Sequence, residues 1–339
     1  MIPGVVAGNA FISSPGKVWN YVATFGSNMG GVAVSEGAGV SDRAYILVGP
    51  ALGGTCQIYR SIDDAQTFQR ITSPLPSYSL SSIAYGNNRF VAIENWYRVL
   101  VSTDNGLTWA QNQALSSDAY LGVTFSGTQF LRWGQNGIIE GSTSGVTGSW
   151  ANRRSGGAAI QGIAVAEKSG SDNVAVAWAG STLHISNDAG NTWSPVVPPS
   201  GAPTRNFLSA VANGPLIVAY YVRGASSTGT NDCLVSYDYG ATWSYVAVTS
   251  DPAITADLGM RSMQKRDVYL MSRTADVAPY EGFAIANSPL GTFVATTLNG
   301  MPGEVGTIQS TSMTAPKDVG AFFGVVKNAG GTCYGVRST

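Results

Sequence analysis

Charge is scarce in this sequence. Lysine and arginine total 19 and aspartate and glutamate 20 of 339 residues, so charged residues make up 12% and the formal net charge is -1. No basic region is present that could neutralise phosphates, and we therefore expect no nucleic-acid partner. No segment is apolar over the length of a membrane span, so we predict a soluble protein without membrane insertion.

Histidine and cysteine are also rare. His184 is the only histidine, and Cys56, Cys233 and Cys333 are isolated from one another. These numbers provide neither a metal cluster nor a disulfide framework, so we expect buried thiols and no metal or other cofactor. Residues 1–17 lack the basic start and apolar run of a secretory signal, and an extracellular role would then require export inside a virus particle.

Glycine and aromatic residues are plentiful instead. The chain contains 42 glycines, 8 tryptophans and 15 tyrosines. Many turns and few solvated helix faces favour an all-β fold of short strands.

A short pattern, S-x-D-x-G-x-T-W, recurs along the chain. Near-complete copies occupy residues 61–68, 102–109, 186–193 and 236–243, and degenerate copies occupy 142–150 and 286–293. The starting serines at 61, 102, 142, 186 and 236 are separated by 41, 40, 44 and 50 residues. A period of this length is typical of propeller blades.

Each period also contains the same series of strand signals. In residues 81–111, β-rich runs at 81–85, 89–94 and 97–102 are separated by polar turns and followed by the motif. A fourth short strand follows the motif, so each unit is predicted to be a four-stranded antiparallel blade.

The four near-complete copies resemble Asp-boxes, the BNR repeats of sialidase-like β-propellers. The resemblance implies that each motif lies in the turn between the third and fourth strands of a blade. It does not imply one activity, because Asp-box propellers include sialidases, other glycosidases, sorting receptors, assembly factors and phage tail components.

We predict a single domain, 1–339, that forms a seven-bladed propeller. The expected blades are 30–73, 79–114, 119–155, 160–198, 207–249, 256–298, and 308–339 together with 8–25. The last blade is shared because "GGTCYGVRS" (330–338) matches "GGTCQIYRS" (53–61), which makes it a third strand, and residues 18–23 then supply the fourth. The N-terminus could instead supply two strands, and six or eight blades are the alternative counts.

The motif residues are predicted to be structural. An aspartate such as Asp104 can accept hydrogen bonds from the next backbone N–H groups, a glycine such as Gly106 tolerates positive φ, and a tryptophan such as Trp109 covers the apolar layer. The full predicted set is Asp63, Asp104, Gly106, Trp109, Asp188, Gly190, Trp193, Asp238, Gly240 and Trp243.

A ligand is then expected at the opposite end of the blades, where the turns between second and third strands lie. Aromatic and arginine side chains gather in those turns and would suit sugar rings. The candidates are Trp96, Tyr97, Trp133, Trp178, Tyr220, Tyr221, Arg223 and Arg273. Packing between blades is the alternative role for each of these rings.

Among functions, we favour a non-catalytic binding or structural module. The charge-poor, glycine-rich composition resembles phage tail and fibre proteins, which suggests a virion component that recognises host-surface glycan, contacts other tail proteins or decorates the particle. The alternative is a glycoside hydrolase, sialidase-like or a polysaccharide depolymerase, with carboxylates among Glu94, Asp118, Asp251 and Asp257. The arginine motif found near the N-terminus of sialidases has no counterpart, since the first arginine is Arg43. An intracellular assembly factor is a third possibility, although the even spread of charge does not favour it.

Overall fold

The regular secondary structure of the computed structural model is almost entirely β-strand. It describes residues 18–27, 29–36, 42–72, 75–94, 98–113, 119–222, 230–249, 264–265, 268–272, 274–275, 283–286, 294–295, 297–299, 308–314, 322–328 and 332–338. A short 3-10 helix, η2 (Gln135–Gly137), lies among the strands. The all-β prediction is confirmed, and no helix within the described ranges is long and apolar enough to cross a bilayer.

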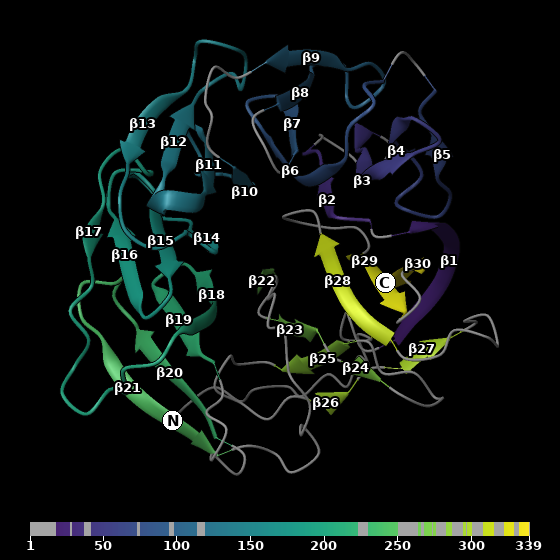
Figure 1. Cartoon of the computed structure of the whole chain (residues 1–339). Helices are drawn as coiled ribbons and strands as arrows, with labels where there is room; N and C mark the ends of the chain where they lie inside the picture. The colour runs from purple at the N-terminus through teal and green to yellow at the C-terminus, as the bar shows by residue number, and fades with distance from the viewer. Residues whose placement is uncertain are drawn as a thin grey trace, which may run out of the picture.

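Six four-stranded antiparallel sheets stand around a central axis (Figure 1). The first three are β2 (Gly31–Val34), β3 (Tyr45–Leu52), β4 (Thr55–Ser61), β5 (Gln69–Arg70); β6 (Leu80–Gly86), β7 (Arg89–Glu94), β8 (Arg98–Ser102), β9 (Ala110–Gln113); and β10 (Tyr120–Phe125), β11 (Phe130–Gly134), β12 (Ile139–Ser142), β13 (Ala151–Arg154). The next three are β14 (Gly162–Ala166), β15 (Val174–Ala179), β16 (Thr182–Ser186), β17 (Ser194–Pro195); β18 (Phe207–Asn213), β19 (Leu216–Tyr221), β20 (Thr230–Ser236), β21 (Ser244–Thr249); and β22 (Gln264–Lys265), β23 (Val268–Ser272), β25 (Phe283–Ala286), β26 (Val294–Ala295).

The seventh sheet joins the two ends of the chain. Its strands are β28 (Ile308–Thr314), β29 (Phe322–Asn328), β30 (Thr332–Ser338) and β1 (Val18–Ser27), and β1 pairs antiparallel with β30. The predicted closure of the ring by an N-terminal and a C-terminal strand in one blade is therefore confirmed. The alternative in which residues before 18 add a second strand lies outside the described residues.

Two short strands make the seventh sheet wider than expected. β24 (Thr274–Ala275) pairs with β28, and β27 (Thr297–Asn299) runs parallel to β1. The parallel pairing of β27 covers the outer edge of β1, an edge that would otherwise expose backbone hydrogen-bonding groups.

The core lies between neighbouring sheets. Ile46 and Val48 of β3 pack with Phe90 and Ala92 of β7. Equivalent clusters join each successive pair of sheets from the closing blade through β2–β5 to β18–β21. The sheet β6–β9 is covered on both faces, which explains why a strand such as "FVAI" in β7 reads as a continuous apolar run rather than an alternating one.

The three cysteines are buried, as predicted for Cys56 and Cys333, and none of them forms a disulfide. Burial raises the pKa of Cys56 to about 11 and that of Cys233 to about 12. These thiols remain protonated at neutral pH and contribute packing rather than nucleophilic chemistry.

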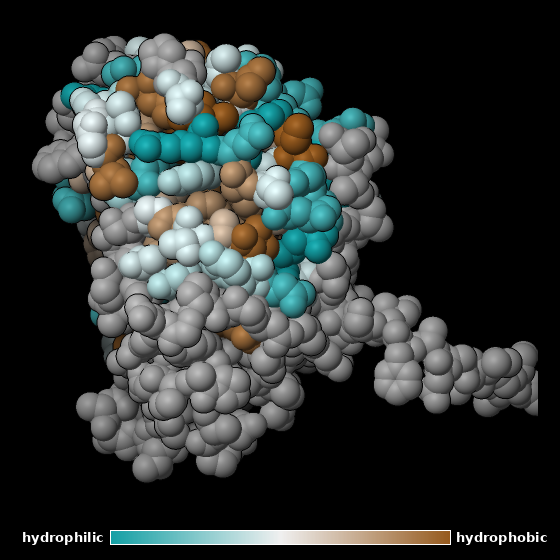
Figure 2. Space-filling view, turned by 90° about the vertical axis from the view of Figure 1, so that its right-hand side faces the viewer, coloured by the Kyte–Doolittle hydropathy of each residue, from teal (hydrophilic) through white to brown (hydrophobic). Residues whose placement is uncertain are grey.

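On the side of the ring in Figure 2, hydrophilic and hydrophobic residues are interleaved over the coloured area.

Candidate binding face

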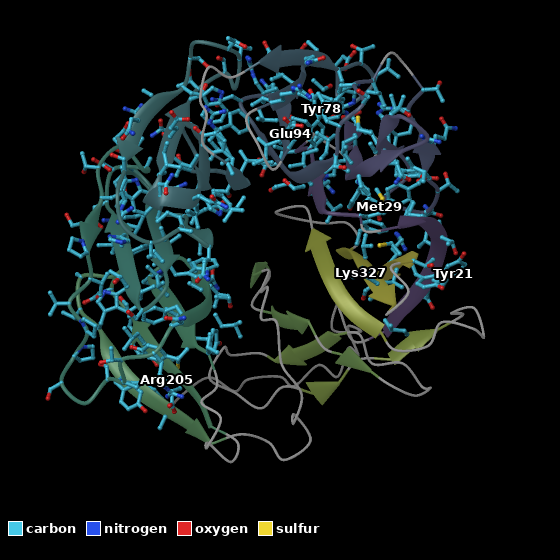
Figure 3. All side chains as sticks on the ribbon, in the orientation of Figure 1. Tyr21, Met29, Tyr78, Glu94, Arg205 and Lys327 are labelled. Carbon is cyan, nitrogen blue, oxygen red and sulfur yellow. The ribbon has the colours of Figure 1, made fainter. Side chains whose placement is uncertain are left out.

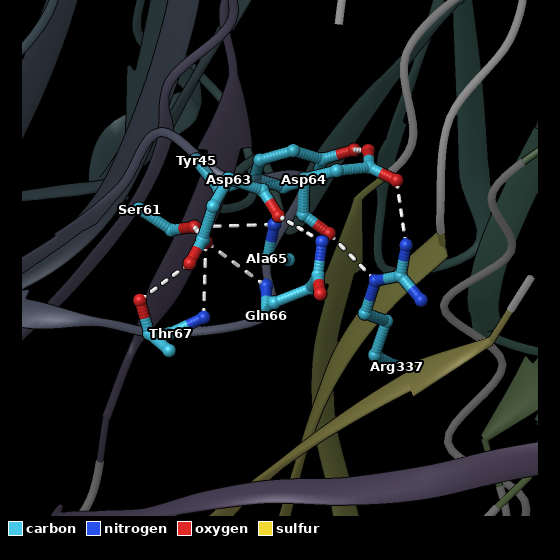
Figure 4. Close-up of polar contacts among 8 residues, drawn as sticks. All are labelled: Tyr45, Ser61, Asp63, Asp64, Ala65, Gln66, Thr67 and Arg337. Atoms are coloured by element: carbon cyan, nitrogen blue, oxygen red, sulfur yellow. Dashed lines mark hydrogen bonds and ion pairs between the residues drawn. The ribbon is translucent and has the colours of Figure 1, made fainter. Parts of the chain in front are cut away.

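The motif turns are closed by an aspartate carboxylate. Between β8 and β9, Asp104 accepts hydrogen bonds from the Thr108 N–H at 2.9 Å, the Thr108 hydroxyl at 2.5 Å and the Ser102 hydroxyl at 2.8 Å. Ser102 Oγ in turn accepts the Gly106 N–H at 2.9 Å. The same carboxylate bonds are made by Asp63, Asp188 and Asp238, and Figure 4 shows those of Asp63.

The electrostatics of these carboxylates are unsuited to acid catalysis. Burial raises the pKa of Asp104, but the hydrogen bonds from Thr108 and Ser102 together lower it by more. The net pKa therefore lies below its ordinary value of 3.8. Hydrogen bonds from Thr242 and Ser236 hold the pKa of Asp238 at about 2. A general acid needs a raised pKa, so a motif aspartate is a poor proton donor at neutral pH.

The motif glycines fix each turn against the preceding blade. Gly106 has φ +83°, and a Cβ there would lie 2.2 Å from Cδ1 of Ile46 in the neighbouring sheet. Gly190 and Gly240 repeat this arrangement. The motif tryptophans complete the turn, since Trp109 Nε1 donates to the Gly106 carbonyl at 3.1 Å, as Trp193 and Trp243 do to Gly190 and Gly240.

We call the opposite end of the ring, which carries the turns between second and third strands, the loop face. Trp133 and Trp178 are the penultimate residues of β11 and β15, and each ring lies over a glycine of the same blade. A Cβ at Gly122 would lie 2.1 Å from Trp133 Cζ2, and one at Gly162 the same distance from Trp178 Cζ2. These two candidates are half-buried, and one face of each ring is occupied by backbone.

Tyr220 and Tyr221 are packed still more tightly. Their exposed fractions are 3% and 5%, and Tyr221 stacks on Phe207 with ring centroids 4.4 Å apart. Little of either ring is available to a sugar. The remaining candidates, Trp96, Tyr97, Arg223 and Arg273, lie outside the described residues.

The innermost strands present a second set of side chains at the loop face. Bulges near the starts of β6, β10 and β18 leave Ser81, Leu121 and Leu208 out of register with the neighbouring strand. Gln161, the residue before β14, occupies the corresponding position in its blade. Leu121 is 41% and Leu208 37% exposed. Because these strands line the axis and start at the loop face, we call this set the channel rim. The sequence pattern did not reveal it, since a bulge depends on the pairing partner.

Most of the exposed large apolar side chains in the described residues lie at this face. Of the eight large hydrophobic side chains that are exposed in the described part of the chain, five lie on the loop face or its rim: Leu52, Leu121, Val197, Leu208 and Val222. Soluble proteins expose single apolar residues on any surface, and the larger share of them at one end of the ring favours that end as the interaction surface.

The charged groups near this face are engaged with one another. Arg132 is 2% exposed, donates to Glu140 at 2.8 Å and lies over the ring of Tyr120 at 3.9 Å. Arg205 forms an ion pair with Asp232. These pairs leave the described rim largely uncharged.

Glu94 is the one glycosidase carboxylate that falls within the described ranges. It is 5% exposed and lies 3.8 Å from Arg98, beside Tyr78 (Figure 3). Asp118, Asp251 and Asp257 lie outside the described residues. Among the residues the structure does describe, no three His, Cys, Asp or Glu side chains come together as a metal site would require.

His184 joins two blades. Its Nε2 lies 3.0 Å from Arg154 Nη2, which can only donate, so Nε2 accepts and the proton resides on Nδ1. Burial and the nearby Arg154 charge lower the pKa of His184 to about 4 from 6.5. Within the described part of the chain, His184 therefore serves as a contact between strand β13 of one blade and strand β16 of the next.

Acid should weaken the fold through this contact. Between pH 6.5 and 4 the unfolded chain binds a proton at His184 that the folded chain does not, so the free energy of unfolding falls by about 3 kcal/mol over that interval and levels off below it. Urea unfolding at several pH values measures this loss. His184→Gln keeps an acceptor for Arg154 but cannot titrate, so the wild type should lose stability relative to this variant as the pH falls from 6.5 to 4. A difference between the two proteins that does not change with pH would contradict the assignment.

Comparison with known proteins identifies the fold. No family model and no curated protein sequence matches the chain. YCF48 bound to D1 peptide is similar with a TM-score of 0.65 and 12% identity, covering 95% of this chain and 96% of its own. The WD40 β-propeller domain of Doa1 gives 0.62 at 10% identity over 94% and 97%, and YCF48 from Cyanidioschyzon merolae gives 0.61 at 16% over 94% and 98%. At such identities the likeness establishes the fold alone: this chain is a β-propeller.

Proposed function

We propose that the protein is a non-catalytic binding propeller that takes its ligand on the loop face. The observation that carries this proposal is that most of the exposed large apolar side chains of the described residues lie at this end of the ring, with Leu121 and Leu208 at equivalent places on the channel rim. A largely uncharged rim with a few amide and hydroxyl groups matches the composition of ligand sites in general. One similar structure is a propeller bound to a peptide, which supports binding as the role.

We further propose that the protein works in a virion, in the tail or a fibre, where it recognises a host-surface glycan, contacts other tail proteins or decorates the particle. Support comes from the composition, with 12% charged residues and 42 glycines. The motif aspartates, held ionised inside their turns, support a scaffold role for the repeats rather than a catalytic one.

Binding assays test this function directly. The protein is applied to a glycan microarray and to bacterial envelope fractions, and Leu121→Asp with Leu208→Asp should weaken any interaction about tenfold or more, because a charge is placed on an apolar contact. Leu107→Asp, at a 54% exposed position on a motif turn, is the matched control. Absence of binding in both assays, or an equal loss in the control, refutes the proposed face. Incubation with envelope polysaccharide should give no cleavage.

A further inference from the structure

The outermost strand of one blade differs from its counterparts. β21 pairs with β20 over six residues, from Thr230 opposite Thr249 to Val235 opposite Ser244. The outermost strands of the other four-stranded sheets have two or four residues. Figure 1 shows β21 as a long arrow on the outer rim of the ring, and no described strand pairs with its outer edge.

β21 also lacks the features that protect exposed sheet edges. Natural edges are blocked by shortness, charge or proline, because a free row of N–H and C=O groups invites another strand. β13 carries Arg153 and Arg154, β17 contains Pro195, and β5 is two residues long with Arg70. The sequence of β21, SYVAVT, contains neither charge nor proline.

The side chains of β21 leave room for a neighbour. Tyr245 is packed into the apolar core between its own sheet and the preceding one, which anchors the strand. Ser244 and Ala247 are small and exposed. Tyr237, which is 65% exposed, lies in the motif turn that connects β20 to β21.

We propose that β21 is a self-association edge, at which a second copy of this chain adds its own β21 antiparallel. An antiparallel pair of identical strands is self-complementary, so a single two-fold contact satisfies both free edges and closes the assembly as a dimer. The edge places no like charges opposite each other, and the formal net charge of -1 gives little repulsion between copies. The two blades would then form one continuous eight-stranded sheet.

The oligomeric state tests this edge independently of the loop face. Analytical ultracentrifugation over a wide range of concentrations should show a monomer–dimer equilibrium. Ala247→Lys should raise its dissociation constant about tenfold or more, because two lysines would lie close together across the two-fold axis. The control is Gln111→Lys, exposed on the outer strand β9, which should leave the equilibrium unchanged.

A second measurement separates a dimer edge from a folding defect. Amide hydrogen exchange of β21 should slow with increasing protein concentration in the wild type and not in Ala247→Lys. At a concentration low enough for the wild type to be monomeric, both proteins should unfold at the same urea concentration. A wild type that stays monomeric throughout, or a Gln111→Lys protein that loses the dimer equally, overturns the proposal.

Discussion

Replacing Gly106 with alanine should lower the free energy of unfolding by about 2–4 kcal/mol. About 1 kcal/mol comes from placing a Cβ on a residue with φ +83°. A further contribution of about 1–3 kcal/mol comes from overpacking. The new Cβ would lie 2.2 Å from Cδ1 of Ile46, so either the buried Ile46 side chain must change its rotamer or the motif turn must move away from the neighbouring blade. Urea unfolding of both proteins measures the loss.

The chain offers a matched control for the backbone contribution alone. Gly148 has φ +78° and nothing within 4 Å of its ideal Cβ, so Gly148→Ala should cost only about 1 kcal/mol. Adding Ile46→Ala to Gly106→Ala removes the clashing methyl, so the two substitutions together should cost less than the sum of their separate losses. Equal losses at Gly106 and Gly148 would show that the turn does not depend on its neighbour.

The first motif turn shows how this constraint can be met without glycine. Ala65 takes the glycine position there with φ +60° and is fully buried. It packs in the cluster that includes Phe323 and Val325 of the closing blade. In this turn alanine replaces glycine, and the turn still contacts the preceding blade.

The sequence predicted the fold best at the motif serines, because a serine at this position of the motif has one structural role. The spacing of the motif serines predicted the blades, because each serine ends a third strand in the structure, as Ser102 ends β8 and Ser186 ends β16. The shared blade followed from the match of 330–338 to 53–61, since a third strand needs a fourth and only the N-terminus was left to supply it.

The loop face was harder to predict because blades are buried on both faces. Tyr220 and Tyr221 are adjacent, so one would be expected to point outward from a sheet with a single buried face, yet both are buried. Leu121 and Leu208 read as ordinary core residues in the sequence, and only the bulges beside them bring them to the rim. Arg132 could not be recognised as a core residue, since its partner Glu140 is set by strand pairing.

Replacing Arg337 with alanine should weaken the closure of the ring. Arg337 extends from the last strand to the first motif turn, where its Nε donates to the Asp64 carbonyl at 2.6 Å and its Nη2 to the Asp64 carboxylate at 2.7 Å (Figure 4). Asp64 also accepts from the Tyr45 hydroxyl at 2.9 Å. The substitution removes the guanidinium from a mostly buried carboxylate, so we expect a loss of about 2–3 kcal/mol in unfolding free energy.

Arg60 is the control, because it holds the same place before a motif serine in the next blade. Its Nε donates to the Asn105 carbonyl at 2.8 Å, but the residue there has no carboxylate. Arg60→Ala should therefore cost only about 1 kcal/mol. Amide exchange locates the difference: Arg337→Ala should accelerate exchange in β30 and β1, which pair only if the ring is closed, whereas Arg60→Ala should not. Uniform acceleration across all the described blades in Arg337→Ala would mean that the closing blade unfolds together with the rest of the ring.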